Sequence, residues 1–243
     1  MGKRIVQCTC LGSFGRFGNQ LFQYVFVRDY AETYNATLEI PEWIGEKIFK
    51  NVSHQRPSCR LLLTDKDRIP WGDVNIDLWG YFQKKEFINN LSAKKIRRWL
   101  QFKDEWLERF KKKDAYSLIA HLRRGDYVTK YSNNFCIVTK ESYINACRKY
   151  SLPVEKITWL SEETQKFTPE LDNDLQFLPD FFSMINADVL LRSNSTFSLW
   201  AGFFNKNKVY SPLVKDKVGF SDVEFVEGNA SALTPRTAEF ILN

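Results

Sequence analysis

The sequence is poor in the residues that common metal and redox sites use. Its 243 residues include only two histidines and five cysteines. An odd number of scattered cysteines without C-x-x-C spacing indicates neither a disulfide framework nor a zinc site. We therefore expect no metal ion and five reduced thiols, which are Cys8, Cys10, Cys59, Cys136 and Cys147.

Long apolar runs are also missing. No stretch approaches the roughly 20 apolar residues that a membrane-spanning helix needs, and the first residues lack the pattern of a signal peptide. Hydrophobic residues make up 44% of the chain and aromatic residues 15%. This content is enough to bury one good hydrophobic core or two small ones. Together with the missing membrane span and signal pattern, it leads us to expect a compact cytoplasmic protein.

The net charge of +6 is placed unevenly along the chain. Residues 1–115 carry 21 Lys/Arg and 14 Asp/Glu, a net of +7, whereas residues 116–243 carry 14 and 15, a net of −1. Lys94–Lys113 holds nine basic and three acidic residues, and its apolar residues recur near helical spacing, which predicts an amphipathic helix with a basic outer face. A solvated surface helix is the favoured interpretation. The alternative is peripheral attachment to the anionic inner membrane surface, where each basic residue contributes about 1 kcal/mol.

Strands and helices are predicted to alternate in the second half of the chain. Such alternation implies a mostly parallel sheet covered on both faces. The predicted strands are Ser117–Leu122, Ile157–Ser161, Ala187–Leu191 and Lys208–Ser211, and the predicted helices are Lys140–Tyr150, Asp180–Asn186 and Ser195–Phe204. In the first half, a strand at Arg4–Leu11 precedes a glycine-rich loop and a helix over Gln20–Tyr34 capped by Asn19, and a strand-like piece lies around Ile76–Phe82. Residues 41–90, broken by prolines, read as irregular.

Two arginines follow the strand that ends near His121, in the segment Ala120-His121-Leu122-Arg123-Arg124-Gly125-Asp126-Tyr127. Ligands of parallel sheets bind beyond the carboxyl ends of the strands, and guanidinium groups bind phosphate oxygens bidentately. The segment therefore suits a pyrophosphate. Read alone, a surface salt bridge between an arginine and Asp126 explains it as well, and a lone buried histidine is more often a core residue than a catalyst.

Hydroxyl and amide side chains gather between another predicted strand and helix, in Arg192-Ser193-Asn194-Ser195-Thr196-Phe197-Ser198. Backbone N–H groups at a helix start can hold an anion together with such side chains. Helix capping accounts for one hydroxyl but not for the whole cluster.

The glycine-rich loop Gly12–Gly18 matches neither G-x-G-x-x-G nor G-x-x-x-x-G-K-[ST]. A connecting turn and a ligand loop bearing Arg16 are equally good interpretations of this segment alone.

Taken in order, four segments resemble the signature blocks of α-1,2-fucosyltransferases. They are Gly15-Arg16-Phe17-Gly18-Asn19-Gln20-Leu21-Phe22-Gln23-Tyr24, Gly80-Tyr81-Phe82-Gln83, His121-x-Arg123-Arg124-Gly125-Asp126-Tyr127 and Asn194-Ser195-Thr196-Phe197-Ser198-x-Trp200. The resemblance implies an α/β fold of the GT-B type with two Rossmann-like lobes of mostly parallel sheets, the N-terminal one small and irregular. It further implies an acceptor-side lobe at residues 1–115 and a donor-side lobe at residues 116–243.

The resemblance also implies a metal-independent, inverting transfer of fucose from GDP-fucose to a glycan hydroxyl, with a lipid-linked glycan as one candidate acceptor. His121, Arg123 and Asp126 would be catalytic, with Arg123 on the β-phosphate and Asp126 as the one nearby candidate base. Asp180 would accept hydrogen bonds from the guanine. The remaining donor contacts would come from Arg16, Gly18, Asn19, Gln20, Arg124, Asn194, Ser195, Thr196, Phe197 and Ser198.

Departures from the family pattern leave the donor sugar and acceptor open. Leu199-Trp200 stands where two tryptophans are usual, and Leu160-Ser161-Glu162-Glu163 where Phe-Ser-Asp-Asp is frequent. Three alternatives remain: a transferase of the same fold that uses a pentose or another deoxysugar nucleotide, a non-catalytic nucleotide- or glycan-binding module, and a metal-dependent transferase that uses Asp172-Asn173-Asp174 as a D-x-D motif. Nucleic acid is not expected as a partner, because no recognition signature accompanies the basic segment.

Overall fold

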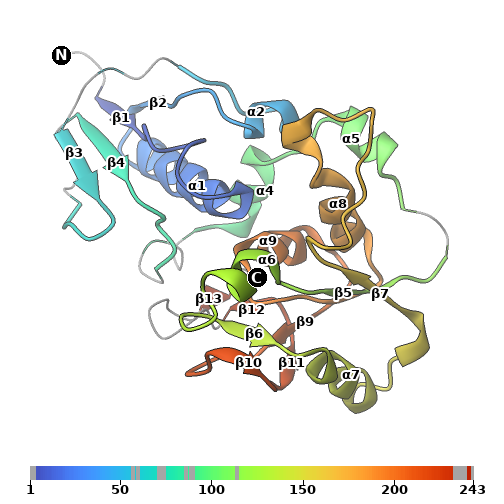
Figure 1. Ribbon diagram of the computed structural model, residues 1–243. Coiled ribbons are helices and arrows are strands. Elements are labelled where there is room, and N and C mark those ends of the chain that lie inside the picture. Colours follow the sequence, from blue (N-terminus) through green and yellow to red (C-terminus); the bar gives the residue numbers. More distant parts are fainter. Residues whose placement is uncertain are drawn as a thin grey trace. The chain divides into compact units, whose positions relative to one another are not determined.

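The computed structural model describes residues 4–55, 58, 61–69, 75–84, 87, 91–112, 115–231 and 240–241. The chain is an α/β protein that divides into two compact units, Met1–Leu107 (unit 1) and Glu108–Asn243 (unit 2), shown in Figure 1. The division lies between Leu107 and Glu108, whereas the sequence suggested a boundary after Ala115. Each unit is described by itself.

Unit 1 contains a four-stranded parallel sheet in the order β2-β1-β4-β3. Its strands are β1 (Ile5–Gln7), β2 (Thr37–Glu39), β3 (Leu61–Thr64) and β4 (Ile76–Trp79). Its helices are α1 (Phe17–Thr33), α2 (Gly45–Ile48) and α4 (Ala93–Trp99), and the boundary to unit 2 falls within α5 (Asp104–Arg109). A regular sheet therefore runs through the region that the sequence predicted to be irregular, although the strand-like piece near Ile76 is confirmed as β4.

Helix α1 begins three residues earlier than predicted. Arg16 occupies the N-cap position and the helix starts at Phe17, so the prediction of Asn19 as the cap is wrong. Asn19 lies inside the first turn, where its Oδ1 accepts a hydrogen bond from Gln83 Nε2 at 2.9 Å. Ten of the 17 residues of α1 are buried, as expected for an element covered on several sides.

The basic segment Lys94–Lys113 is not one helix. It forms α4 and α5, separated by an extended stretch in which Phe102 bridges to Phe49. The backbone N–H of Lys103 donates to Ile48 O at 3.0 Å, so these tertiary hydrogen bonds replace the helical ones. Lys113 lies outside the described residues. No helix among the described residues is long and apolar enough to cross a membrane.

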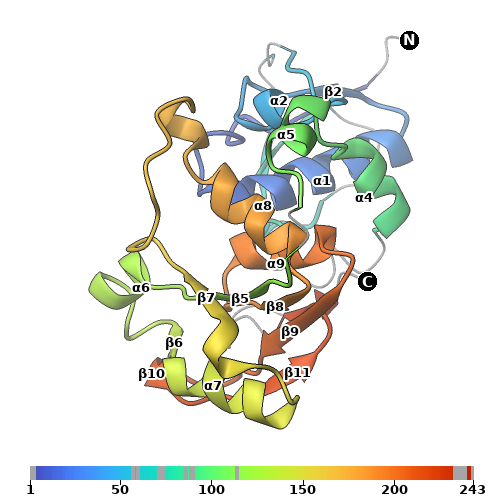
Figure 2. The same cartoon turned by 90° about the vertical axis from the view of Figure 1, so that its right-hand side faces the viewer.

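Unit 2 is built on a five-stranded sheet in the order β11-β9-β8-β5-β7, in which only β11 is antiparallel to its neighbour. Figure 2 shows α8 and α9 on one face of this sheet and α7 on the other. The strands are β5 (Leu118–His121), β7 (Ile157–Leu160), β8 (Val189–Leu191), β9 (Lys208–Pro212) and β11 (Phe225–Glu227), and the helices are α6 (Gly125–Thr129), α7 (Lys140–Lys149), α8 (Leu178–Asn186) and α9 (Thr196–Phe204). Two further pairs complete the unit: β6 (Cys136–Val138) with β10 (Gly219–Ser221), and β12 (Ala230–Ser231) with β13 (Phe240–Ile241).

The α/β fold with mostly parallel sheets and the alternation predicted for this half are thereby confirmed, with element ends that differ by one to two residues. The predictions missed β6, β10, β11, β12, β13 and α6.

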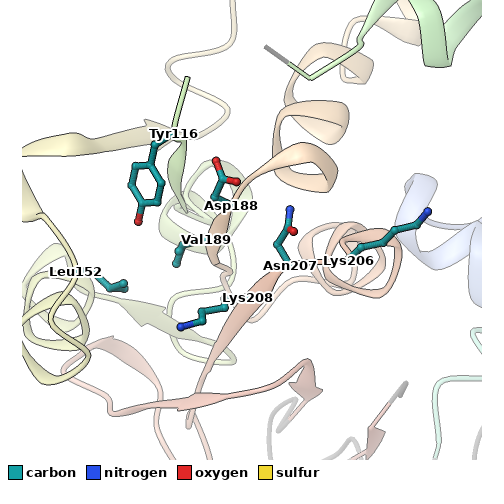
Figure 3. A pocket seen from close by; sticks show the side chains of 7 residues that line it. All are labelled: Tyr116, Leu152, Asp188, Val189, Lys206, Asn207 and Lys208. Carbon is teal, nitrogen blue, oxygen red and sulfur yellow. The ribbon is translucent and has the colours of Figure 1, made fainter. Parts of the chain in front are cut away.

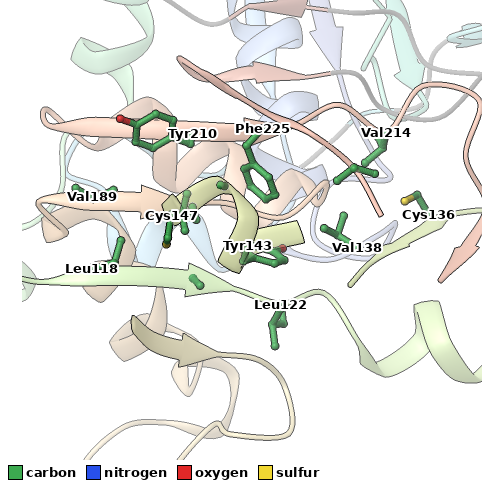
Figure 4. Packing of buried hydrophobic residues seen from close by; sticks show 14 residues of the cluster. Leu118, Leu122, Cys136, Val138, Tyr143, Cys147, Val189, Tyr210, Val214 and Phe225 are labelled. Atoms are coloured by element: carbon green, nitrogen blue, oxygen red, sulfur yellow. The ribbon is translucent and has the colours of Figure 1, made fainter. Parts of the chain in front are cut away.

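The core of unit 2 packs α7 against the sheet (Figure 4). Tyr143 of α7 is fully buried there, and its hydroxyl donates to His121 O at 2.8 Å, which ties the helix to the end of β5. Cys136 and Cys147 lie in this core as free thiols, and Cys8 and Cys10 are free and buried in unit 1, as predicted. Cys59 lies outside the described residues.

Candidate functional site

Two of the predicted loops meet at the carboxyl edge of the unit 2 sheet. Strands β5 and β8 are parallel neighbours, with Ala120 opposite Leu191, so the loops that follow them leave the sheet side by side. His121 Nδ1 lies 2.9 Å from Ser193 Oγ in a buried hydrogen bond that joins the two loops directly. The histidine ring also contacts Phe197, with ring centroids 5.8 Å apart. The structure therefore brings the predicted arginine and hydroxyl segments together at one edge of the sheet.

The serine hydroxyls of the second loop bind one another. Ser195 Oγ caps α9 by accepting from the Ser198 backbone N–H, and the Oγ atoms of Ser193, Ser195 and Ser198 lie 3.1 Å from each other. All three residues are buried. Hydrogen bonds among the serines thus explain more of these hydroxyls than helix capping alone does. They also hold the start of α9 in a fixed position.

Three other residues of this segment differ in exposure. Asn194 is buried and donates from Nδ2 to Cys136 O at 3.0 Å, which fixes the loop to β6. Thr196 and Phe197 are half-buried at the first helical positions of α9. The first turn of a helix presents backbone N–H groups that have no acceptor within the helix, so this end of α9 is suited to an anion.

Arg123 is neutralised by two carboxylates. Its guanidinium forms ion pairs with Asp126 and Glu162, and its side chain is only 12% exposed. Glu162 reaches it because β7 pairs in parallel with β5, with His121 opposite Leu160, so the loop after β7 lies beside the loop after β5. The site prediction missed Glu162, although its position two residues after a strand of the same sheet was a usable signal.

Arg124 stabilises the backbone. Its guanidinium donates to Arg123 O at 3.3 Å and to Val138 O at 2.9 Å, and it lies over the ring of Phe220. Its own backbone N–H donates to Glu162 Oε2 at 3.2 Å. The next residue, Gly125, has φ of +42°, a region that favours glycine, and it allows the chain to turn from β5 into α6.

Arg192 is a cation that sequence reasoning passed over. It is 1% exposed, donates from Nε to Ser211 Oγ at 2.8 Å and from a terminal nitrogen to Ser193 O at 2.7 Å, and has no carboxylate partner in the described part of the chain. Burial lowers its pKa to about 9, so it stays charged at neutral pH. Its position directly after a buried strand was the available signal.

His121 is neutral at physiological pH. Burial, together with the nearby charge of Arg192, lowers its pKa to about 4. The imidazole therefore offers hydrogen bonds but no positive charge to a ligand.

Asp180 stands at the start of α8, on the same edge of the sheet. Parallel strand β7 ends at the carboxyl edge of the sheet and β8 begins at the amino edge, so the helix between them, α8, starts at the carboxyl edge. Phe181 of α8 contacts Phe197 of α9 there, with ring centroids 5.1 Å apart. Asp180 has no hydrogen-bond or ion-pair partner among the described residues, and burial raises its pKa to about 6. A half-buried carboxylate without a partner is a common mark of a ligand site.

The other predicted donor contacts lie in unit 1. Arg16 is exposed before α1, Gly18 is buried within α1, and Asn19 is held by Gln83. Gln20 donates from Nε2 to Gly12 O at 3.3 Å and to Gly15 O at 3.0 Å, so it shapes the glycine-rich loop. Their contact with a donor stays a prediction.

The acidic segment Asp172-Asn173-Asp174 is exposed and forms the N-cap and the first two residues of a short 3-10 turn, Asn173–Leu175. Among the described residues no three His, Cys, Asp or Glu side chains gather as a metal site would require. Independence from metal stays a prediction.

A hollow of about 510 Å³ lies elsewhere in unit 2 (Figure 3). It opens at the first residues of β8 and β9, so it is at the amino edge of the sheet. Its lining residues are Tyr116, Leu152, Asp188, Val189, Lys206, Asn207 and Lys208. Ligands of parallel sheets bind at the opposite edge, so we do not assign the donor to it.

No protein-family model matches the chain, and no curated protein matches it in sequence. Among solved structures it is similar to the NodZ α-1,6-fucosyltransferase soaked with GDP-fucose, at 13% identity and a TM-score of 0.56, over 93% of this chain and 99% of that one. It is also similar to the fucosyltransferase NodZ from Bradyrhizobium, at 12% identity and a TM-score of 0.55, with the same coverage. The chain therefore has the GT-B-like α/β fold of these fucosyltransferases.

Proposed function

We propose that the protein transfers fucose from GDP-fucose to a glycan hydroxyl and forms an α-1,2 linkage. The observation that carries the proposal is the hydrogen bond between His121 and Ser193, which joins the arginine-bearing loop to the start of α9. Asp180 adds a carboxylate that has no partner among the described residues, at the same edge of the sheet. The fold and the four signature segments support the choice of a fucosyltransferase, and the segments alone support the α-1,2 linkage.

In the proposed complex, unit 2 holds the nucleotide. Asp180 accepts hydrogen bonds from the N1–H and 2-amino group of guanine, which repays the cost of keeping its charge half-buried. The first turn of α9 and Arg123 contact the pyrophosphate, and Arg192 adds a fixed positive charge behind the Ser193 carbonyl.

Arg123 has to exchange partners for this to happen. Without a ligand it is balanced by Asp126 and Glu162. A pyrophosphate has a higher charge density than a carboxylate, so it competes for the guanidinium of Arg123. Its binding releases one of the two carboxylates. We propose that Asp126, once released, takes the proton of the acceptor hydroxyl as the hydroxyl oxygen bonds to the anomeric carbon and the bond from that carbon to the β-phosphate oxygen breaks.

The alternatives differ in donor and in turnover. A transferase with another sugar nucleotide would keep the phosphate contacts but bind another base or sugar. A non-catalytic module would bind GDP and release no sugar. The NodZ structures are of an α-1,6-fucosyltransferase, so the fold does not favour one linkage over another.

Thermal-shift screening of the full chain against GDP, GDP-fucose, GDP-mannose, UDP-sugars and dTDP-sugars tests the donor. A ligand at 100 times its Kd stabilises the native state by about 2.7 kcal/mol. We expect stabilisation by guanosine diphosphates alone, and fucose transfer that EDTA leaves unchanged. Stabilisation by UDP or dTDP compounds instead would contradict the proposal.

A further inference from the structure

Three aromatic rings form a stack in unit 1 that the proposed donor site does not use. Phe14 lies 4.5 Å from Trp79 and 4.3 Å from Tyr81 between ring centroids, with interplanar angles of 27° and 22°. Trp79 and Tyr81 are each 37% exposed, so the stacked rings present a shared apolar patch to solvent. We call Phe14, Trp79 and Tyr81 the aromatic shelf.

The shelf stands at the carboxyl edge of the unit 1 sheet. Phe14 belongs to the loop between β1 and α1, Trp79 ends β4, and Tyr81 follows two residues later. Strands β1 and β4 are parallel neighbours, so the segments that follow them meet at one edge, which is where parallel sheets bind ligands.

Hydrogen bonds to the loop that carries Phe14 hold this part of the aromatic shelf in place. Gln23 Nε2 donates to Phe14 O at 2.9 Å, and Gln20 Nε2 donates to Gly15 O at 3.0 Å. Gly15 has φ of +83°, and a Cβ on it would lie 2.9 Å from the Tyr81 ring, so only glycine leaves room for the stack.

A second set of contacts holds Tyr81. Its backbone N–H donates to Asp65 Oδ2 at 3.0 Å, and a Cβ on Gly80 would lie 2.6 Å from Asp65 Cγ. Gly15 and Gly80, with which two of the signature segments begin, thus leave room for the close packing that holds the aromatic shelf.

Planar amides accompany the rings. Gln83 Nε2 donates to Asn19 Oδ1 at 2.9 Å, and Asn19 lies directly beside Gly15. A pyranose ring presents a C–H face that packs on an aromatic ring and a rim of hydroxyls that bond to amides. An exposed apolar patch with a polar rim, built on rigid elements, fits such a ligand.

We propose that the aromatic shelf binds a sugar ring of the acceptor glycan. Only the identification of this glycan as the acceptor rests on the proposed function, because a transferase needs a glycan site as well as a nucleotide site. The shelf's own evidence is independent of unit 2, so the two proposals can be tested separately.

The test compares the full-length protein with Trp79→Leu and Trp79→Phe on a printed panel of oligosaccharides ending in β-galactose, mannose or N-acetylglucosamine. We expect the wild type to bind at least one glycan. Trp79→Leu, which keeps an apolar side chain but removes the ring, should bind it about five- to tenfold more weakly. Trp79→Phe should retain most of the binding, and Phe167→Ala, which removes a 68% exposed ring in unit 2, should bind like the wild type.

GDP-induced thermal shifts, measured on the same proteins, separate the two proposals. An unchanged GDP shift in Trp79→Leu supports a glycan shelf, and loss of the shift would assign the rings to the nucleotide and overturn the inference. Wild-type protein that binds no glycan of the panel, or equal binding by Trp79→Leu and wild type, would also overturn it. Absence of any GDP shift in the wild type, with the glycan pattern intact, would refute the proposed donor while the shelf stands.

Discussion

The half-buried carboxylate of Asp180, which has no partner in the described part of the chain, predicts that one conservative substitution stabilises the free protein while it weakens nucleotide binding. Burial raises the Asp180 pKa from 3.8 to about 6, so the folded state binds this proton more tightly than the unfolded state does. Stability is therefore highest below pH 4 with respect to this group, and is lost as pH rises through about 4 to 6. The full shift corresponds to about 3 kcal/mol, which partial solvent screening reduces to about 1–2 kcal/mol.

Asp180→Asn removes this titration and keeps the side-chain shape. At pH 7.5 we expect the variant to be about 1–2 kcal/mol more stable than the wild type in urea unfolding, which is about 2–8 °C in Tm for a chain of this size. At pH 4.5 the advantage should shrink, because the wild-type carboxyl is then largely protonated in the folded state. GDP affinity should fall at least about tenfold, since the amide presents an N–H group to the guanine donors.

The control is Asp216→Asn, which changes an exposed carboxylate of unit 2. It should leave stability and GDP binding unchanged. Equal stability of Asp180→Asn and wild type at pH 7.5, or a gain that is the same at pH 4.5, would refute the reasoning.

Three further predictions concern the site and the basic segment. Arg123→Ala should lower fucose transfer by about 10²–10³-fold, because one preorganised contact to a developing charge is worth about 3–4 kcal/mol, and single-turnover rates near wild type would contradict this. His121, whose pKa is lowered to about 4, binds a proton more readily when unfolded, so stability should fall by up to about 3 kcal/mol as pH drops from 6.5 to 4. His121→Gln should flatten this pH dependence of stability in urea titrations. An unchanged pH profile would show that His121 does not cause it. Because Lys94–Lys113 forms two short helices with partly paired charges, we expect co-sedimentation to be equal with anionic and neutral liposomes, and preferential binding to anionic vesicles would support membrane attachment.

The sequence predicted most of unit 2 because local pattern and burial agree there. Strand β5 is a fully buried apolar run and α7 an amphipathic helix, so period and hydrophobicity indicate the same element. In unit 1 local pattern and burial do not agree. Leu61 and Leu62 of β3 are more than half exposed, and the periodic segment after Lys94 is interrupted by hydrogen bonds to the residues around Ile48, which no local pattern reveals.

The candidate site was predictable in its location but not in its internal bonding. The loops after β5 and β8 follow from the rule for parallel sheets. The sequence could not show that Glu162 and Asp126 share Arg123, that the serines bind one another, or that Asp180 has no partner among the residues the structure describes, because each depends on which side chains the fold brings together.

Hydrogen–deuterium exchange of the full chain with and without GDP tests the central claim most directly. The account predicts that GDP slows exchange in three segments of unit 2, namely residues 121–127, 178–182 and 193–199. Slower exchange around Tyr116 and Lys206–Lys208, at the opposite edge of the sheet, or no change in any of the three segments, would contradict it.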